Sequence, residues 1–138
     1  MVRQVGATVV AMIIIGVGCG AGSTTPELRT GRGVYADNCS SCHGSRGQGG
    51  VAPTLSEVRE TWPSCDDHQV WIALGTERWK AERGPDYGAH DTPVTRAMPA
   101  HADRLTAEEI AAVAAFERVE YGGGDPATEL AACGLTDE

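Results

Sequence analysis

The segment Cys39-Ser40-Ser41-Cys42-His43 constrains this chain more than any other part of the sequence. Two cysteines separated by two residues, with a histidine directly after the second, are typical of three kinds of site. These are a redox-active dithiol, half of a metal site and a covalent haem attachment point. Each of the three requires different partners elsewhere in the chain, so the remaining sequence has to decide between them.

The spacing of apolar residues predicts helices and no strands. A short helix is expected over residues 27–39, and a second over 64–75, where a serine can cap its start and a glycine can end it. A capping box that starts at Thr106 opens a third helix, which continues to residue 121. Residues 76–99 show neither helical nor strand periodicity, and a long irregular segment of this kind is usually functional. We therefore expect an all-α domain.

This organisation favours haem attachment. A redox dithiol is typical of a βαβ setting, which is missing around the motif, and a structural zinc site requires four ligands, whereas the other histidines and cysteines are scattered. Two thiols at this spacing can reach two vinyl groups of one porphyrin, and the adjacent imidazole of His43 can bind the iron. Met98 is the one methionine beyond the N-terminal segment, so it is the candidate for the second axial ligand.

The N-terminal residues are expected to export the chain and to hold it at a membrane. Arg3 precedes an apolar run, Val5–Gly18, which is short for a membrane span and typical of a signal peptide. Residues 1–18 are therefore predicted to be a signal peptide or an N-terminal anchor, and 19–26 a flexible tether. Cys19 follows a lipobox-like sequence and is the candidate lipid anchor, with an uncleaved anchor and plain secretion as alternatives.

Export would place the domain, predicted over residues 27–124, in a compartment that permits disulfides. Cys65 and Cys133 then remain as a candidate pair, which would tie a C-terminal tail, 125–138, back to the domain; two free thiols are the alternative. The formal net charge of −8 disfavours nucleic acid as a partner and favours a basic protein surface, or none.

Two long segments resemble class I c-type cytochromes. The first, GRGVYADNCSSCHGSRGQGGVAPTL, is similar to the haem-attachment segment of that family, and the second, AMPAHADRLTAEEIAAVAAFERVEYG, is similar to its C-terminal segment with the methionine ligand. The intervening part, from TWPSC through VWIALG to GPDYG, resembles exported monohaem cytochromes of Gram-positive bacteria. The resemblance covers about residues 29–124 and implies the class I cytochrome c fold, with short helices around one covalently bound haem c.

The resemblance also implies a role for individual residues around the haem. Cys39 and Cys42 would form thioether bonds, His43 would be the proximal ligand and Met98 the distal ligand. The carbonyl group of Pro53 would accept the other ring N–H of His43.

Further residues would pack around this centre. The resemblance implies that the first and last helices cross where Gly31 faces Phe116, with Tyr35 beside them. The remaining histidines, His68, His90 and His101, are expected to be solvated or capping residues.

Five residues are expected to contact the haem away from its iron. Leu55, Trp71 and Leu74 would form part of its apolar wall, although ordinary core packing is the alternative for the last two. Trp79 and Tyr87 are candidate hydrogen-bond donors to the haem propionates, and ordinary loop packing explains them equally well.

The resulting prediction is a carrier of single electrons, not an enzyme, anchored at the outer face of the cytoplasmic membrane. Its partners would be redox proteins such as a quinol-oxidising complex and a terminal oxidase or dehydrogenase. Two alternatives stay open. The chain would be a fixed haem c subunit of such a complex, or it would contain a five-coordinate haem that binds a small ligand or reacts with peroxide.

Overall fold

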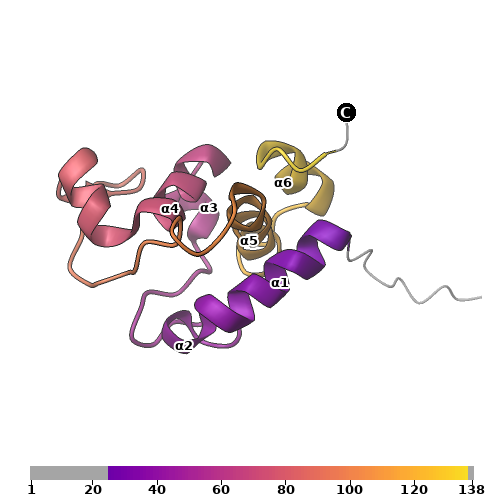
Figure 1. The fold of residues 1–138 in the computed structure, drawn as a ribbon, viewed down its shortest axis with the longest axis horizontal. Coiled ribbons are helices and arrows are strands. Elements are labelled where there is room, and N and C mark those ends of the chain that lie inside the picture. The colour runs from indigo at the N-terminus through magenta and orange to yellow at the C-terminus, as the bar shows by residue number, and fades with distance from the viewer. Residues whose placement is uncertain (1–24, 137–138) are drawn as a thin grey trace, which may run out of the picture.

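The computed structural model describes residues 25–136, which form a mostly helical domain (Figure 1). Its helices are α1 (Pro26–Asn38), α2 (Ser40–His43), α3 (Val58–Thr61), α4 (Cys65–Glu82), α5 (Ala107–Glu120) and α6 (Pro126–Ala132). The expected all-α class is confirmed, with one addition: β1 (Asp86–Tyr87) and β2 (Thr92–Pro93) pair as a short antiparallel hairpin. The expectations for the signal segment 1–18 and for Cys19 concern residues outside the described range.

Hydrogen bonds at the helix starts explain why the main helices begin where they do. The Thr25 hydroxyl accepts from the amide of Leu28 at the start of α1. At α5, the amide of Glu109 donates to the Thr106 hydroxyl over 3.2 Å, and the Thr106 amide donates to the Glu109 carboxylate over 2.9 Å. The capping box is thereby confirmed, as is Ser64 as the cap of α4.

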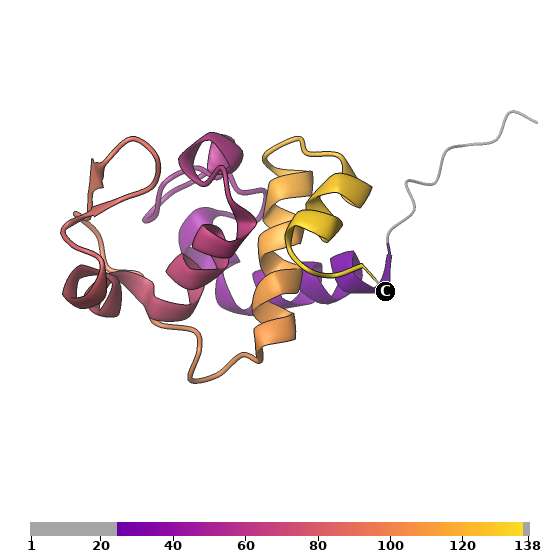
Figure 2. The ribbon, with the colours of Figure 1, turned by 90° about the horizontal axis from the view of Figure 1, so that it is seen from above.

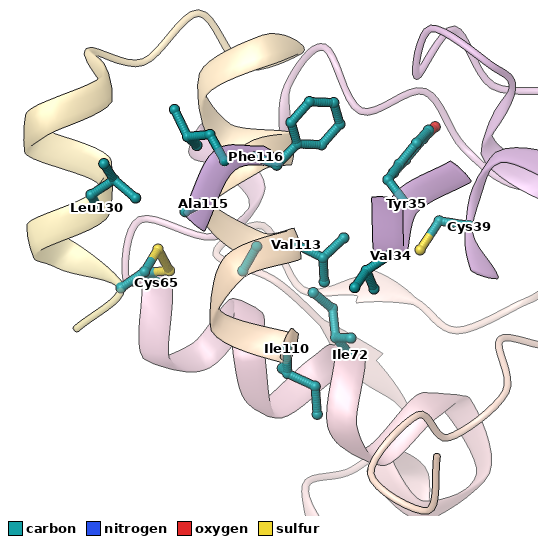
Figure 3. Packing of buried hydrophobic residues seen from close by; sticks show 13 residues of the cluster. Val34, Tyr35, Cys39, Cys65, Ile72, Ile110, Val113, Ala115, Phe116 and Leu130 are labelled. Carbon is teal, nitrogen blue, oxygen red and sulfur yellow. A yellow bond between two sulfur atoms is a disulfide. The ribbon is translucent and has the colours of Figure 1, made fainter. Parts of the chain in front are cut away.

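Helix α5 is the central element of the domain, since it packs against α1, α3, α4 and α6 (Figures 1 and 2). Val113, Ala114 and Ala115 in its middle are fully buried. Figure 3 shows Val113 among side chains from α1 and α4, including Val34 and Ile72. The small alanines let neighbouring helices approach α5 closely from several sides.

The crossing of α1 and α5 depends on Gly31. A Cβ atom on this residue would lie 2.1 Å from the carbonyl oxygen of Ala112 and 2.7 Å from the Cβ of Phe116. Tyr35 lies one turn further along α1, with its ring centroid 5.8 Å from that of Phe116. The expected meeting of Gly31 with Phe116, with Tyr35 beside them, is confirmed.

Helix α4 corrects the expectation for residues 76–99. Gly75 has φ 61° and ψ −179°, so α4 consists of two helical segments joined by a sharp kink. The sequence pattern ends the helix at Gly75, but the chain becomes helical again from Thr76 to Glu82. This second segment is too short to show a clear apolar period, and it is stabilised by the burial of Trp79 in a cluster with Val58 and Trp62.

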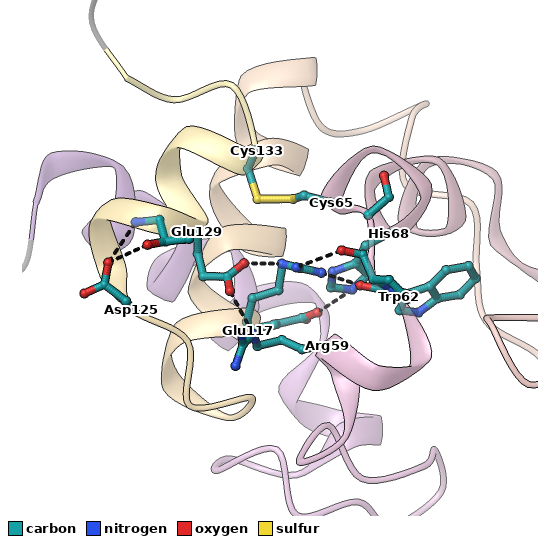
Figure 4. Close-up of polar contacts among 12 residues, drawn as sticks. Arg59, Trp62, Cys65, His68, Glu117, Asp125, Glu129 and Cys133 are labelled. Carbon is teal, nitrogen blue, oxygen red and sulfur yellow. Dashed lines mark hydrogen bonds and ion pairs between the residues drawn. A yellow bond between two sulfur atoms is a disulfide. The ribbon is translucent and has the colours of Figure 1, made fainter.

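The C-terminal residues also form more structure than a tail. Helix α6 begins after Asp125, whose carboxylate accepts from the amide of Thr128, and it packs against α5. Cys133 at its end forms a disulfide with Cys65 at the start of α4 (Figure 4). Leu130 is buried in the main core, so residues beyond 124 extend the core.

A buried ion pair joins α6 to α5. The Nε of Arg118 lies 2.5 Å from Glu129, and both side chains are at most 5% exposed. The Arg118 guanidinium also donates to the carbonyl oxygen of Trp62 over 2.6 Å, and Arg59 forms a second ion pair with Glu129. Because each buried charge has a partner and further hydrogen bonds, the cost of removing these groups from water is offset.

We expect Gly31→Ala to destabilise the folded protein by about 1–3 kcal/mol, because the new methyl group forces α1 away from α5. Gly33→Ala is a matched control on the same helix, since a Cβ there meets no atom within 4 Å. It should stabilise the protein by about 0.5–1 kcal/mol through helix propensity. Denaturant unfolding followed by circular dichroism measures both changes. Equal stabilities for the two variants would contradict the proposed close contact.

Candidate haem site

Two adjoining cavities lie between the attachment motif, α4 and the segment before α5. Both are bordered by His43 from α2 and by Met98 from the segment that precedes α5. The other residues common to both walls are Ala52, Leu55, Trp62, Trp71 and Ala97. The two candidate axial ligands therefore border the same space, although 54 residues separate them in the sequence.

The attachment motif lies where α1 gives way to the single turn of α2. Cys39 follows the last residue of α1 and is buried, whereas Cys42 in α2 is exposed. Both are free thiols and both line the second cavity. Burial raises the pKa of the Cys39 thiol, and the negative charge of Glu117 raises it further. The pair of sulfur atoms is thus available at the edge of the cavity.

The ring of His43 is oriented by the loop that follows the motif. Its Nδ1 lies 2.9 Å from the carbonyl oxygen of Pro53, as the resemblance implies. A carbonyl oxygen only accepts, so Nδ1 carries the proton and Nε2 keeps a free lone pair. The loop itself is fixed by backbone hydrogen bonds. The amide of Ala52 donates to the carbonyl oxygen of Cys42, and the amide of Gly49 donates to the carbonyl oxygen of His43. An imidazole fixed in this tautomer is suited to bind a metal through Nε2.

Met98 is positioned through its main chain by Thr76. The Thr76 amide donates to the Met98 carbonyl oxygen over 3.0 Å. The Thr76 hydroxyl accepts from the Met98 amide over 3.1 Å and lies 3.3 Å from the Met98 carbonyl oxygen. The kink makes this possible, because a Cβ on Gly75 would lie only 2.6 Å from that carbonyl oxygen. Thr76 was not singled out from the sequence, although its position directly after a helix-ending glycine was the available signal.

Aromatic rings form much of the wall. Trp71 lines both cavities, with its ring centroid 5.5 Å from that of Trp62 and 4.7 Å from that of Tyr87. Leu55 also lines both cavities, and Tyr87 lines the first. Trp62 was not singled out from the sequence, although its place in the TWPSC segment was a signal. This aromatic part of the wall is suited to a flat aromatic group.

Two of the expected haem contacts lie elsewhere. The indole N–H of Trp79 donates to the carbonyl oxygen of Asp86 over 2.8 Å, so it is not free to bind a propionate. Leu74 packs against the cluster of Val58, Trp62 and Trp79 and lines neither of the two cavities. Both expectations are corrected: the Trp79 N–H is used by the backbone of β1, and Leu74 belongs to the packing of this second cluster.

The expectation that the remaining histidines are solvated or capping residues is also wrong for two of them. His68 and His101 are each 2% exposed and line the second cavity, whereas His90 is exposed as expected. Arg104 lies 3.3 Å from Nδ1 of His101. Burial, and secondly the charge of Arg104, lower the pKa of His101. These side chains became buried through tertiary packing, which their sequence neighbours did not indicate.

The residues present fit a covalently bound haem. Two free thiols line the second cavity, and both an imidazole with a free Nε2 and a thioether border the two cavities. This donor set is that of a six-coordinate haem c. No cluster of three or more His, Cys, Asp or Glu residues suited to a metal ion occurs within residues 25–136.

The model of the cytochrome c family matches residues 28–116, which is more than half of the chain. The chain belongs to the cytochrome c family. As a cytochrome c it carries a covalently bound haem c with iron and transfers electrons.

A solved structure supports the fold. The cytochrome c described here is similar to the c-type cytochrome XoxG from Methylobacterium extorquens AM1, with a TM-score of 0.50 and 20% sequence identity. The match covers 70% of this chain and 52% of XoxG, so this cytochrome matches about half the length of that protein. No curated protein sequence matches this cytochrome.

We expect the buried His101 to make the cytochrome less stable in mild acid. Because its pKa is lowered in the folded state, the unfolded chain takes up the proton first as the pH falls below about 6.5. The stability contributed by neutral His101 is therefore full above that pH and is lost below it. The free energy of unfolding should fall less between pH 7 and pH 5 in His101→Gln than in the wild type. His90→Gln, which changes an exposed residue, should behave like the wild type.

Proposed function

We propose that this cytochrome passes single electrons between redox proteins through a haem c with His43 and Met98 as axial ligands. The observation that carries the proposal is the shared cavity. His43 borders it with its ring fixed by Pro53, and Met98 borders it with its main chain fixed by Thr76. When bound, haem c supplies an iron that accepts and releases one electron. With both axial positions filled, this centre has no open position for a substrate.

The protein residues perform three tasks in this proposal. Cys39 and Cys42 hold the cofactor covalently, which prevents its loss outside the cell interior. Pro53 fixes the orientation of the His43 ring, and the aromatic wall excludes water from the centre. A dry site with fixed ligands needs little rearrangement when its charge changes, which favours fast electron transfer. The thioether of Met98 favours the reduced iron and raises the potential.

Partners would dock where the haem edge comes nearest to solvent. Cys42 is exposed, which supports the attachment side as that surface. The contact should be small and short-lived, and the acidic protein favours a basic partner face, such as on a quinol-oxidising complex, a terminal oxidase or a dehydrogenase.

The location is a further part of the proposal. Membership of the cytochrome c family indicates a place outside the cytoplasm. We propose that residues 1–18 export the chain and that Cys19 carries a lipid, which holds domain 27–124 at the outer face of the membrane. Within residues 25–136, no helix has both the length and the hydropathy required to cross a bilayer.

Optical spectra of the haem-loaded protein test the ligands. We expect a c-type pyridine haemochrome and, in the ferric form, the weak near-infrared band of iron–thioether ligation. Met98→Ala should lose that band and become high-spin, whereas Cys39→Ser with Cys42→Ser should abolish covalent attachment. A high-spin ferric wild type without the band would contradict the carrier proposal and favour a ligand-binding or peroxidase-like haem.

Thr76→Val tests how Met98 is held. The valine keeps the shape of Thr76 but removes the hydroxyl that bridges the Met98 amide and carbonyl groups. Losing these hydrogen bonds at a buried site costs about 1–3 kcal/mol. Imidazole should therefore displace Met98 from the ferric form at roughly 5- to 150-fold lower concentration. Thr76→Ser retains the hydroxyl and should stay close to the wild type; equal imidazole affinity in all three proteins would exclude this role.

A further inference from the structure

A buried pair of polar side chains borders the second cavity of the haem site. His68 on α4 and Glu117 on α5 approach within 3.2 Å, from the ring Nε2 to the carboxylate Oε2 (Figure 4). Their side chains are only 3% and 5% exposed. Both line the cavity that also contains Cys39, His43 and Met98. A pair of titratable groups thus lies in the wall of the cavity, within the apolar interior of the protein.

The pair can exist with or without one extra proton. Without it, Nε2–H of neutral His68 donates to the Glu117 carboxylate, and the pair carries one net negative charge. With it, either the ring is doubly protonated or the carboxyl group is protonated and donates to Nε2; both arrangements are neutral overall. In each protonated arrangement, Nδ1 of His68 carries a hydrogen.

The Nδ1 atom of His68 has the properties expected of this proton site. It is the one buried side-chain nitrogen or oxygen in residues 25–136 that has no hydrogen-bond partner. The Trp62 ring stacks beside the imidazole, with ring planes inclined by only 8°. Neither state of the pair is thus fixed by a second hydrogen bond. A nearby change of charge can therefore decide which state is favoured.

The surrounding charges do not neutralise Glu117 in another way. Arg118, the next residue on α5, binds Glu129 and the Trp62 carbonyl group, and Arg104 contacts His101. Within residues 25–136, His68 is the one ion-pair partner of Glu117. Several titratable groups surround the pair or share its cavity: Tyr35 and Asp37 of α1, Cys39 after α1, Cys42 and His43 of α2, His101 and Arg104 before α5, and Tyr121 after α5.

We propose that His68 and Glu117 form a proton-binding site that is coupled to the oxidation state of the haem iron. Oxidation adds one positive charge to the iron, which favours the negative, deprotonated pair; reduction favours the protonated pair. On reduction, one electron enters from a redox partner and one proton enters from water. On oxidation, both leave. The cytochrome would then carry a proton together with its electron over the pH range in which the pair titrates.

The coupling predicts a reduction potential that falls as the pH rises. We expect the reduced protein to bind the proton at least tenfold more tightly than the oxidised protein. For a one-electron couple, a tenfold ratio corresponds to about 59 mV of total potential change.

Spectroelectrochemical titration of the isolated, haem-loaded protein from about pH 5 to pH 8 tests the proposal. Glu117→Gln keeps the shape of the side chain and removes its charge, so the affinity ratio should fall below twofold and the potential should rise. Glu120→Gln is the matched control: it removes the same charge from an exposed position on the same helix and should keep the tenfold ratio. The double variant H68Q/E117Q removes both titratable groups and serves if the single variant folds poorly.

Two results would overturn the proposal: a wild-type ratio below twofold, or a tenfold ratio that persists in whichever of the two Glu117 variants folds. Persistence would assign the proton to another group, such as a haem propionate. The inference requires the haem c that family membership supplies, and it does not depend on which proteins exchange electrons with it. Failure to find a redox partner therefore leaves this test unaffected.

Discussion

The close contact of α1 with α5 is the constraint on which the rest of the structure depends. Gly31 lets the α1 backbone approach Ala112 at a distance that any side chain would prevent. Because Cys39 caps the end of α1 and α2 follows directly, this crossing also fixes the attachment motif relative to the core. Helix α5 in turn packs against α4, which holds the segment containing Met98. The two halves of the haem site are therefore aligned through one helix crossing.

The local parts of this design could be predicted from the sequence. Three features depend on residues that are close together in the chain. They are the spacing of Cys39 and Cys42, the capping box at Thr106, and the contact of His43 with the carbonyl oxygen of Pro53. Gly31 and Met98 were also identified, because a glycine in a helix and a lone methionine are unusual enough to require an explanation. The first three signals have physical causes that act over a few residues, whereas Gly31 and Met98 stand out by residue type although their contacts are distant in the sequence.

The parts that could not be predicted depend on contacts between distant residues. The helix after Gly75 forms because Trp79 is buried against Trp62, and its indole N–H binds Asp86 instead of facing the haem. His68 looks like a solvated residue in the first turn of a helix, and only the packing of α4 on α5 places it against Glu117. No periodicity reveals that two polar side chains on separate helices will share one buried space.

The disulfide between Cys65 and Cys133 has a further consequence for the dynamics of the methionine segment. It closes a covalent ring that contains Met98 and all of α5. If Met98 binds the iron as proposed, the segment between the kink and α5 would stay tied to the folded domain at both of its ends even when the ligand is released. Rebinding would then be a search by a segment whose two ends are already held by α4 and α5, which makes closing the loop less costly. Transient release of Met98 would reverse readily and would not spread into global unfolding.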